Sequence, residues 1–269
     1  MTTVLRYDIG EIEPYINWIY FYHAWGLSGK PSSEKARLRA DAETMLAEFK
    51  SRYHTHAVFG LFPANSDGDD IIIDGVRVPF LRQQTRKTDG SANLCMADFI
   101  RPLSLGETDR IGVFATTVDA GMEKDYCDDD YLKIMSQTLA DRLAEATAEK
   151  MHEEVRRHYW GYAAHENLSI QEMLNCGYRG IRPAVGYPSM PDISINFILS
   201  ELVGMSEIGI RLTVSGAMQP HASVSGLMLA HPRASYFDVG PIGEDQLSDY
   251  ASRRGIPVNM MRRFLSASL

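Results

Sequence analysis

The segment of residues 180–192 places the strongest constraint on how this chain can fold. Its sequence, Gly-Ile-Arg-Pro-Ala-Val-Gly-Tyr-Pro-Ser-Met-Pro-Asp, holds three prolines and two glycines. Proline is excluded from the interior of a helix and from a central strand, and it pushes the residue before it towards extended geometry. We therefore expect a stiff, extended segment whose backbone carbonyl and amide groups are free to meet a ligand.

Two side chains of the 180–192 segment suit ligand binding. Arg182 carries a forked guanidinium group that matches a carboxylate, and Tyr187 carries an aromatic ring with a polar hydroxyl group. A rigid connection between a helix and the next element would have the same composition. The segment is therefore a candidate ligand-binding loop, and its composition does not identify the ligand.

The composition excludes several classes of protein. The 269 residues carry a net charge of −8 and no long basic patch, so we expect no nucleic-acid binding. No stretch approaches the roughly 20 apolar residues that a membrane span needs, and the first residues do not resemble a signal peptide. Three widely spaced cysteines, Cys95, Cys127 and Cys176, do not form a disulfide framework or a zinc site. We expect a cytoplasmic protein with reduced thiols and no metal site.

Familiar catalytic motifs are also missing from the sequence. There is no phosphate-binding Gly-Lys-Ser/Thr loop, no Gly-x-Gly-x-x-Gly, no His-Glu-x-x-His and no Gly-x-Ser-x-Gly. Cys176 lies near the expected end of a short helix, where the helix dipole disfavours a thiolate nucleophile. We assign no catalytic residue from these patterns.

Apolar periodicity and turn residues divide the chain into interspersed helices and strands. We expect helices over residues 11–25, 33–50, 128–158, 192–203, 247–254 and 257–265, and a short one opened by a Ser169–Glu172 capping box and closed by Gly177. We expect strands over residues 56–62, 71–73, 76–78, 111–117, 208–214, 223–229 and 235–239, with a hairpin turn at Asp74-Gly75. Hairpins outnumber strand-helix-strand units, which favours one α+β domain over residues 1–269 with an antiparallel sheet.

Many short stretches of the chain resemble, in the same order, the C-terminal activation domain of cobalamin-dependent methionine synthase. They include residues 25–30, 58–65, 81–84, 140–146, 159–162, 180–191, 215–218, 222–226 and 249–255. The resemblance implies a single C-shaped α+β domain, with a twisted antiparallel sheet flanked by helices and the N-terminal helices, about residues 11–50, packed on the sheet core. It also implies a shallow groove that binds S-adenosylmethionine.

The resemblance further implies a part in methionine biosynthesis. In this family S-adenosylmethionine donates a methyl group to a cobalamin that has been oxidised to the inactive Co(II) state, and flavodoxin or a similar reductase supplies one electron. The chain contains no Asp-x-His-x-x-Gly cobalamin-binding motif and no homocysteine or folate domain. We therefore expect a reactivation subunit of a split methyltransferase, whose cobalamin is carried by a partner chain.

The family motifs also imply a set of ligand-binding residues. Arg182 would hold the carboxylate of the ligand, and Glu145 would lie near its sulfonium group. The groove would be lined by Pro183, Ala184, Gly186 and Tyr187, with further contacts from Tyr236, Phe237 and Asn17. Without the resemblance, the sequence pattern predicts that Asn17 is a hydrogen-bonded core residue and that Glu145 is a solvent-exposed helix residue.

Three positions depart from the family pattern. Asn17 replaces an aspartate that takes the amino group of the ligand, Cys176 replaces a second acidic residue near the sulfonium group, and Ile193 replaces a histidine. A charged hydrogen bond contributes roughly 1.5–3 kcal/mol, so two lost carboxylates would weaken ligand binding considerably. The alternative to a reactivation subunit is therefore a non-catalytic docking module, which binds a corrinoid protein without tight S-adenosylmethionine binding.

Overall fold

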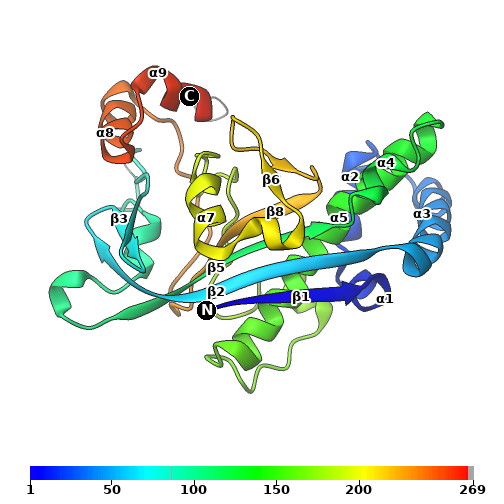
Figure 1. Ribbon diagram of the computed structural model, residues 1–269, viewed down its shortest axis with the longest axis horizontal. Coiled ribbons are helices and arrows are strands. Elements are labelled where there is room, and N and C mark those ends of the chain that lie inside the picture. Colours follow the sequence, from blue (N-terminus) through cyan, green and yellow to red (C-terminus); the bar gives the residue numbers. More distant parts are fainter. Residues whose placement is uncertain (86, 266–269) are drawn as a thin grey trace.

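The computed structural model describes residues 1–85 and 87–265, and its sheet is built on one long strand, β2 (His54–Asp67). The first half of β2 pairs with β1 (Thr2–Asp8) and the second half with β3 (Asp70–Ile73). The other edge of β2 pairs with β5 (Asp109–Val118) along most of its length (Figure 1). With β4 (Val76–Pro79) and β8 (Ser223–Met228) the order is β4-β3-β2-β5-β8, and all pairs are antiparallel. The expected α+β class with an antiparallel sheet is confirmed.

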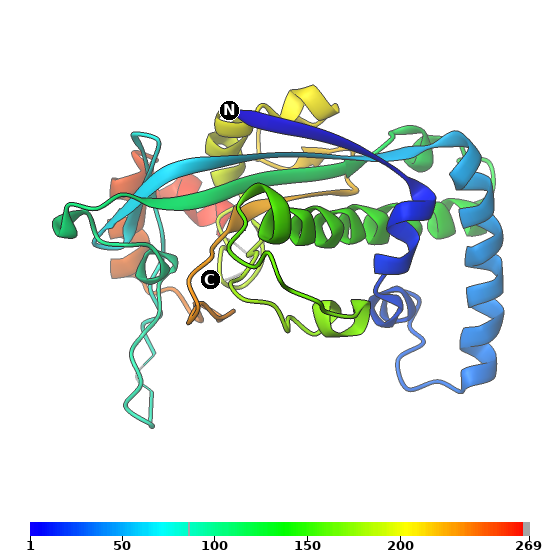
Figure 2. The ribbon, with the colours of Figure 1, turned by 90° about the horizontal axis from the view of Figure 1, so that it is seen from below.

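Helices bury both faces of this sheet. Along β2, Ala57 and Phe59 belong to the apolar group that α5 (Asp130–Glu154) covers, whereas Val58 points to the group that α7 (Ile195–Val203) covers. Figure 2 shows α5 running alongside the sheet. Successive residues of a strand point to opposite faces of the sheet. Since helices cover both faces here, the residues on each face are apolar, and β5 is buried from Ile111 to Val118.

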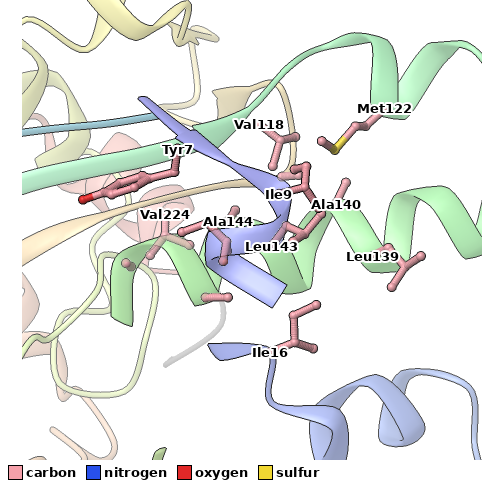
Figure 3. Packing of buried hydrophobic residues seen from close by; sticks show 14 of the residues in the cluster. Tyr7, Ile9, Ile16, Val118, Met122, Leu139, Ala140, Leu143, Ala144 and Val224 are labelled. Atoms are coloured by element: carbon pink, nitrogen blue, oxygen red, sulfur yellow. The ribbon is translucent and has the colours of Figure 1, made fainter. Parts of the chain in front are cut away.

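The N-terminal helices pack against the start and middle of α5. Figure 3 shows Ile9 and Ile16 beside Leu139 and Leu143 of α5. The expected single helix over residues 11–25 is wrong, because the structure has three pieces: α1 (Ile9–Ile12), a 3₁₀ turn (Glu13–Tyr15) and α2 (Trp18–Ala24). Asn17 breaks the helix, since its backbone is extended (φ −81°, ψ 96°) and its side chain caps α2. The next helix, α3 (Ser32–Arg52), matches the expectation closely.

Several strand expectations are corrected. Residues 208–214 do not form one strand, because a 3₁₀ turn (Met205–Ile208) lies between left-handed Gly204 and Gly209 and only β6 (Arg211–Leu212) pairs with β7 (Met218–Gln219). Residues 235–239 form no strand. Strand β1 was not expected, because its sequence, Thr-Thr-Val-Leu-Arg-Tyr-Asp, shows no clean alternation of apolar and polar residues.

The other helices and the hairpin follow the expected order, but a short helix, α4 (Gly121–Lys124), and two 3₁₀ turns were not expected. The β3–β4 hairpin turns at Asp74 and Gly75, both with positive φ. The later helices are α4, α6 (Ile170–Leu174), α8 (Glu244–Arg254) and α9 (Val258–Phe264). A π-helical turn (Val155–Tyr159) extends α5. Short 3₁₀ turns lie at Met96–Phe99 and Leu103–Leu105. Within the described part of the chain, none of these helices combines the length and apolar character that crossing a membrane requires.

The capping box of α6 is present, but its closing residue was wrongly assigned. Ser169 accepts from the backbone of Glu172, whose side chain returns to the Ser169 amide. The left-handed residue after the helix is Cys176 (φ 56°), not Gly177. A non-glycine side chain in this conformation is uncommon, which explains why the sequence pointed to the neighbouring glycine.

The 180–192 segment lies along the free edge of β8. Ile181 and Leu229 exchange two backbone hydrogen bonds of 2.9 Å, Leu227 N–H donates to Pro183 O (3.0 Å), and Val185 N–H donates to Ser225 O (2.9 Å). This is the register of an antiparallel edge strand, in which Pro183 has no N–H to return the hydrogen bond from Leu227. The exclusion of a helix and of a central strand is confirmed, because an edge position tolerates proline.

We predict that Gly226→Ala lowers the free energy of unfolding by about 1–3 kcal/mol, the usual cost of overpacking. A Cβ atom at this position would lie 2.1 Å from Pro183 O and 2.9 Å from Ala184 Cα, so the segment would have to leave β8. The matched control is Gly10→Ala in α1, where no atom lies within 4 Å of the new Cβ. Urea titration of both variants measures the effect, and equal stabilities would contradict the prediction.

Candidate functional site

A cavity of about 580 Å³ lies between α5, the N-terminal helices and the 180–192 segment. The α5 helix contributes Arg142, Glu145, Ala146 and Glu149, whose spacing of three and four residues places them on one helix face. The other walls come from four parts of the chain: residues 15–20, residues 174–176 at the end of α6, the 180–192 segment and residues 236–238. Their lining residues are Tyr15, Asn17, Tyr20, Leu174, Cys176, Arg182, Pro183, Ala184, Tyr187, Pro188, Ser189, Tyr236, Phe237 and Asp238.

Eight of the nine residues that the sequence suggested line this one cavity. They are Asn17, Glu145, Arg182, Pro183, Ala184, Tyr187, Tyr236 and Phe237. The ninth, Gly186, is not part of the lining; it has φ 88° and its N–H donates to Met190 O (2.8 Å). Its place is in the turn that presents Tyr187 to the cavity.

Tyr187 connects the 180–192 segment to α5. Its hydroxyl donates to Glu145 Oε1 over 2.6 Å. Burial raises the pKa of the Tyr187 hydroxyl, and the negative charge and hydrogen bond of Glu145 raise it further. Glu145, which pattern alone assigned to a solvated helix face, is therefore a half-buried member of the site.

Arg182 is buried, and it is paired inside the protein. Its Nη2 donates to Glu149 Oε1 over 2.5 Å, and its guanidinium lies over the ring of Phe114. Burial by itself lowers the pKa of the guanidinium, but the negative charge of Glu149 raises that pKa overall. The cation is thus fixed in the wall of the cavity.

A chain of hydrogen bonds links the backbone of Arg182 to Cys176. Arg182 N–H donates to the Tyr236 hydroxyl (2.9 Å), which lies 3.2 Å from the Tyr178 hydroxyl. Tyr178 donates its single hydrogen to Cys176 Sγ (3.8 Å), so Tyr236 must be the donor to Tyr178. Cys176 therefore closes a directional chain as its final acceptor.

The substituted position Asn17 is already engaged in local structure. Its Oδ1 accepts the N–H of Ile19 (3.1 Å) as the N-cap of α2. An amide oxygen has two lone pairs, so one remains for a ligand. Ile193, the third departure from the family pattern, does not line the cavity.

Sequence reasoning missed several lining residues, of which Glu149 and Asp238 matter most for charge. Together with Glu145 they set three carboxylates against the two guanidinium groups of Arg142 and Arg182. Glu149 follows Glu145 by one helical turn, a spacing that would have predicted its position once Glu145 was assigned. The cavity therefore keeps an excess of one negative charge even without acidic groups at residues 17 and 176.

His152 lies behind the cavity on the next turn of α5. It is fully buried, packs edge-on against the Tyr178 ring at 4.9 Å, and has no hydrogen-bond partner for either ring nitrogen among the described residues. Burial lowers the pKa of its ring well below the usual value, and the guanidinium groups of Arg156 and Arg182 lower it further. His152 is therefore neutral in the folded protein.

The arrangement suits a small ligand that carries both a carboxylate and a cationic centre. The Arg182 guanidinium can pair with the carboxylate of such a ligand, and the Glu145 carboxylate can pair with its cationic centre. Tyr187, Tyr236 and Phe237 supply aromatic surface. Among residues 1–85 and 87–265 no cluster of three or more histidine, cysteine or acidic side chains is arranged to hold a metal ion.

Comparison with known proteins agrees with this geometry. The family described as "Vitamin B12 dependent methionine synthase, activation domain" matches residues 8–255 of the chain. Among solved structures, a crystal structure of the MetH reactivation domain bound to AdoHcy is similar, with a TM-score of 0.93 and 41% sequence identity. The match covers 100% of this chain and 90% of that one.

We predict that His152→Leu reduces the loss of stability in acid. In the wild type, unfolding lets His152 bind a proton below its ordinary pKa of about 6.5, so its contribution lowers the free energy of unfolding as the pH falls, by about 1 kcal/mol per pH unit. Leucine cannot bind a proton, so the variant lacks this pH-dependent contribution to the free energy of unfolding. Urea titrations at pH 7.5 and pH 5 measure it, with His165→Leu, an exposed position, as the control. An unchanged pH dependence in His152→Leu would contradict the prediction.

Proposed function

Because the chain belongs to the activation-domain family of vitamin B12-dependent methionine synthases, we propose that it binds S-adenosylmethionine in the cavity beside α5. There it presents the methyl group for the reductive remethylation of cob(II)alamin. The observation that carries the proposal is the placement of Arg182 and Glu145 in one cavity of about 580 Å³. AdoHcy, present in the similar reactivation domain, is the demethylated product of this donor.

Each feature of the donor has a complement in the cavity. Arg182 binds the carboxylate, Glu145 lies near the sulfonium group, and Asn17 accepts from the amino group. The aromatic rings of Tyr187, Tyr236 and Phe237 cover the nucleoside. Pro183 and Ala184 line the cavity beside them, and Gly186 sets the turn. S-adenosylmethionine carries one net positive charge, whereas its demethylated product carries none. The excess negative charge of the cavity therefore favours the donor over the spent product.

The cobalamin supplies the cobalt that accepts the methyl group, and one electron must reach it before transfer. Residues 1–269 contain no Asp-x-His-x-x-Gly motif, so we place the corrinoid outside them. As a separate proposal, a partner chain carries it, as in a split methionine synthase. Flavodoxin or a similar reductase is the proposed electron source. Three unpaired cysteines suit the reducing cytoplasm, and we propose that residues 1–269 act as one domain.

A docking module without tight donor binding is the second candidate. The observation that favours it is that Asn17 and Cys176 are neutral and already accept hydrogen bonds from Ile19 and Tyr178. Such a module would bind the corrinoid protein and control its conformation. Calorimetric titration with S-adenosylmethionine separates the two candidates, because only the first requires binding in the micromolar range.

We predict that Arg182→Lys weakens S-adenosylmethionine binding by about 10- to 100-fold, since lysine keeps the charge but loses the forked geometry. Lysine is preferable to alanine, which would leave Glu149 without its partner. Arg179→Lys, an exposed arginine three residues earlier, is the control. Calorimetry on the wild type and both variants gives the dissociation constants. The proposed function would be rejected if the wild type released no heat with S-adenosylmethionine, either alone or with the corrinoid partner. The role of Arg182 would be rejected if Arg182→Lys bound S-adenosylmethionine as tightly as the wild type.

We predict that Asn17→Asp combined with Cys176→Glu tightens S-adenosylmethionine binding by about tenfold or more, because each change adds a carboxylate to the cavity. Aspartate still caps α2, and glutamate meets the same left-handed backbone that cysteine already adopts. The same titration measures the effect. The two substituted positions would prove irrelevant to donor affinity if the double variant bound no more tightly than the wild type.

A further inference from the structure

The ion pair between Arg182 and Glu149 is built into the wall of the cavity. The two side chains are only 6% and 17% exposed, and a single hydrogen bond of 2.5 Å joins Nη2 to Oε1. Both residues line the cavity. A pair with so little water around it is held in one geometry, because separating its members would leave buried charges unpaired.

The pair leaves the Nη1 end of the guanidinium available, whereas Nε is fully buried and has no partner among the described residues. Arginine has five N–H donors, and Glu149 takes one of them. Nη1 has no protein acceptor within the described part of the chain, and it is not among the fully buried unpartnered atoms. A carboxylate that enters the cavity can therefore bind Arg182 while Glu149 stays in place.

The surroundings of Glu149 direct its charge to Arg182. His152, one turn further along α5, is neutral, so it does not compete as a cation. Arg156, the next residue on that face, is held by Glu166 over 2.5 Å and lies over the Tyr178 ring. Arg182 is thus the one described guanidinium that pairs with Glu149.

The backbone of Arg182 is fixed independently of its side chain. Its N–H is bound by Tyr236, and its neighbours Ile181 and Pro183 pair with β8. The long side chain is the remaining source of freedom, and ordering a free arginine side chain on binding would cost conformational entropy. A residue that orders it beforehand therefore improves ligand affinity without touching the ligand's reacting atoms.

We propose that Glu149 is the positioning residue of the carboxylate-binding arginine: it fixes the Arg182 guanidinium from behind, so that the open donors face the amino-acid end of the ligand. This inference rests on the proposed function, because it concerns the same cavity. It assigns Glu149 a part in ligand discrimination, since its effect should reach only ligands that carry the carboxylate.

The test compares two ligands on the intact chain. S-adenosylhomocysteine carries the amino-acid carboxylate, and methylthioadenosine has the same nucleoside thioether without it. We expect Glu149→Ala to weaken S-adenosylhomocysteine binding by about tenfold or more and to leave the affinity for methylthioadenosine within about twofold. Glu149→Gln, whose amide oxygen can still accept from Nη2, should lose less, about threefold, with the same selectivity.

Asp70→Ala is the matched control for stability. It removes another buried carboxylate that holds an arginine, Arg253, over 2.5 Å, and it does not line the cavity. We expect it to destabilise the fold and to leave both affinities unchanged. Glu149→Gln keeps the test decisive even where Glu149→Ala does not fold.

The outcomes are distinct. A selective loss of S-adenosylhomocysteine affinity in the Glu149 variants supports the inference. Unchanged binding, tighter binding, or an equal loss for both ligands overturns it, and the last of these would reduce Glu149 to a structural role. If the wild type binds neither ligand, the proposed function and this inference both fail. If the wild type binds S-adenosylhomocysteine and the Glu149 variants bind it equally well, only this inference fails.

Discussion

The backbone pairing between the 180–192 segment and β8 is the interaction on which the site depends. A proline-rich chain has few hydrogen bonds of its own, yet its amide and carbonyl groups need partners where they are buried. The edge of β8 supplies them at Ser225 and Leu227, and Leu229, just after β8, supplies two more. Because Gly226 has no side chain, the segment lies close enough for Arg182 to point at α5 and for Pro183 and Ala184 to line the cavity.

The second contribution comes from α5, which serves the core and the site at once. One face packs on the sheet through residues such as Leu139 and Leu143, and another presents Arg142, Glu145 and Glu149 to the cavity. Three of the five charged groups of the site are therefore carried by a rigid 25-residue helix, and Arg182 and Asp238 are the other two. The two links from this helix, Glu145 to Tyr187 and Glu149 to Arg182, hold the 180–192 segment from the side opposite β8.

The sequence located the residues that line the cavity better than it located the strands. Family motifs located Arg182, Tyr187 and Glu145 because those residues lie in distinctive, proline-rich or charged stretches. The apolar pattern gave a wrong strand where tertiary contacts decide the backbone conformation. Residues 235–239 are apolar enough for a strand, but Val239 N–H donates to Pro188 O in the 180–192 segment. Glu149 was missed because an exposed position and a cavity wall look alike on a helix, and only the fold shows which face the 180–192 segment covers.

The length of β2 also limits how this protein can change. Its 14 residues extend about 45 Å, and neighbouring residues alternate between the group under α5 and the group under α7. Insertion or deletion of one residue within β2 would exchange the two sets of side chains for every position beyond it. Changes in chain length are therefore confined to connections such as the one between β4 and β5, while β2 can vary only by substitution.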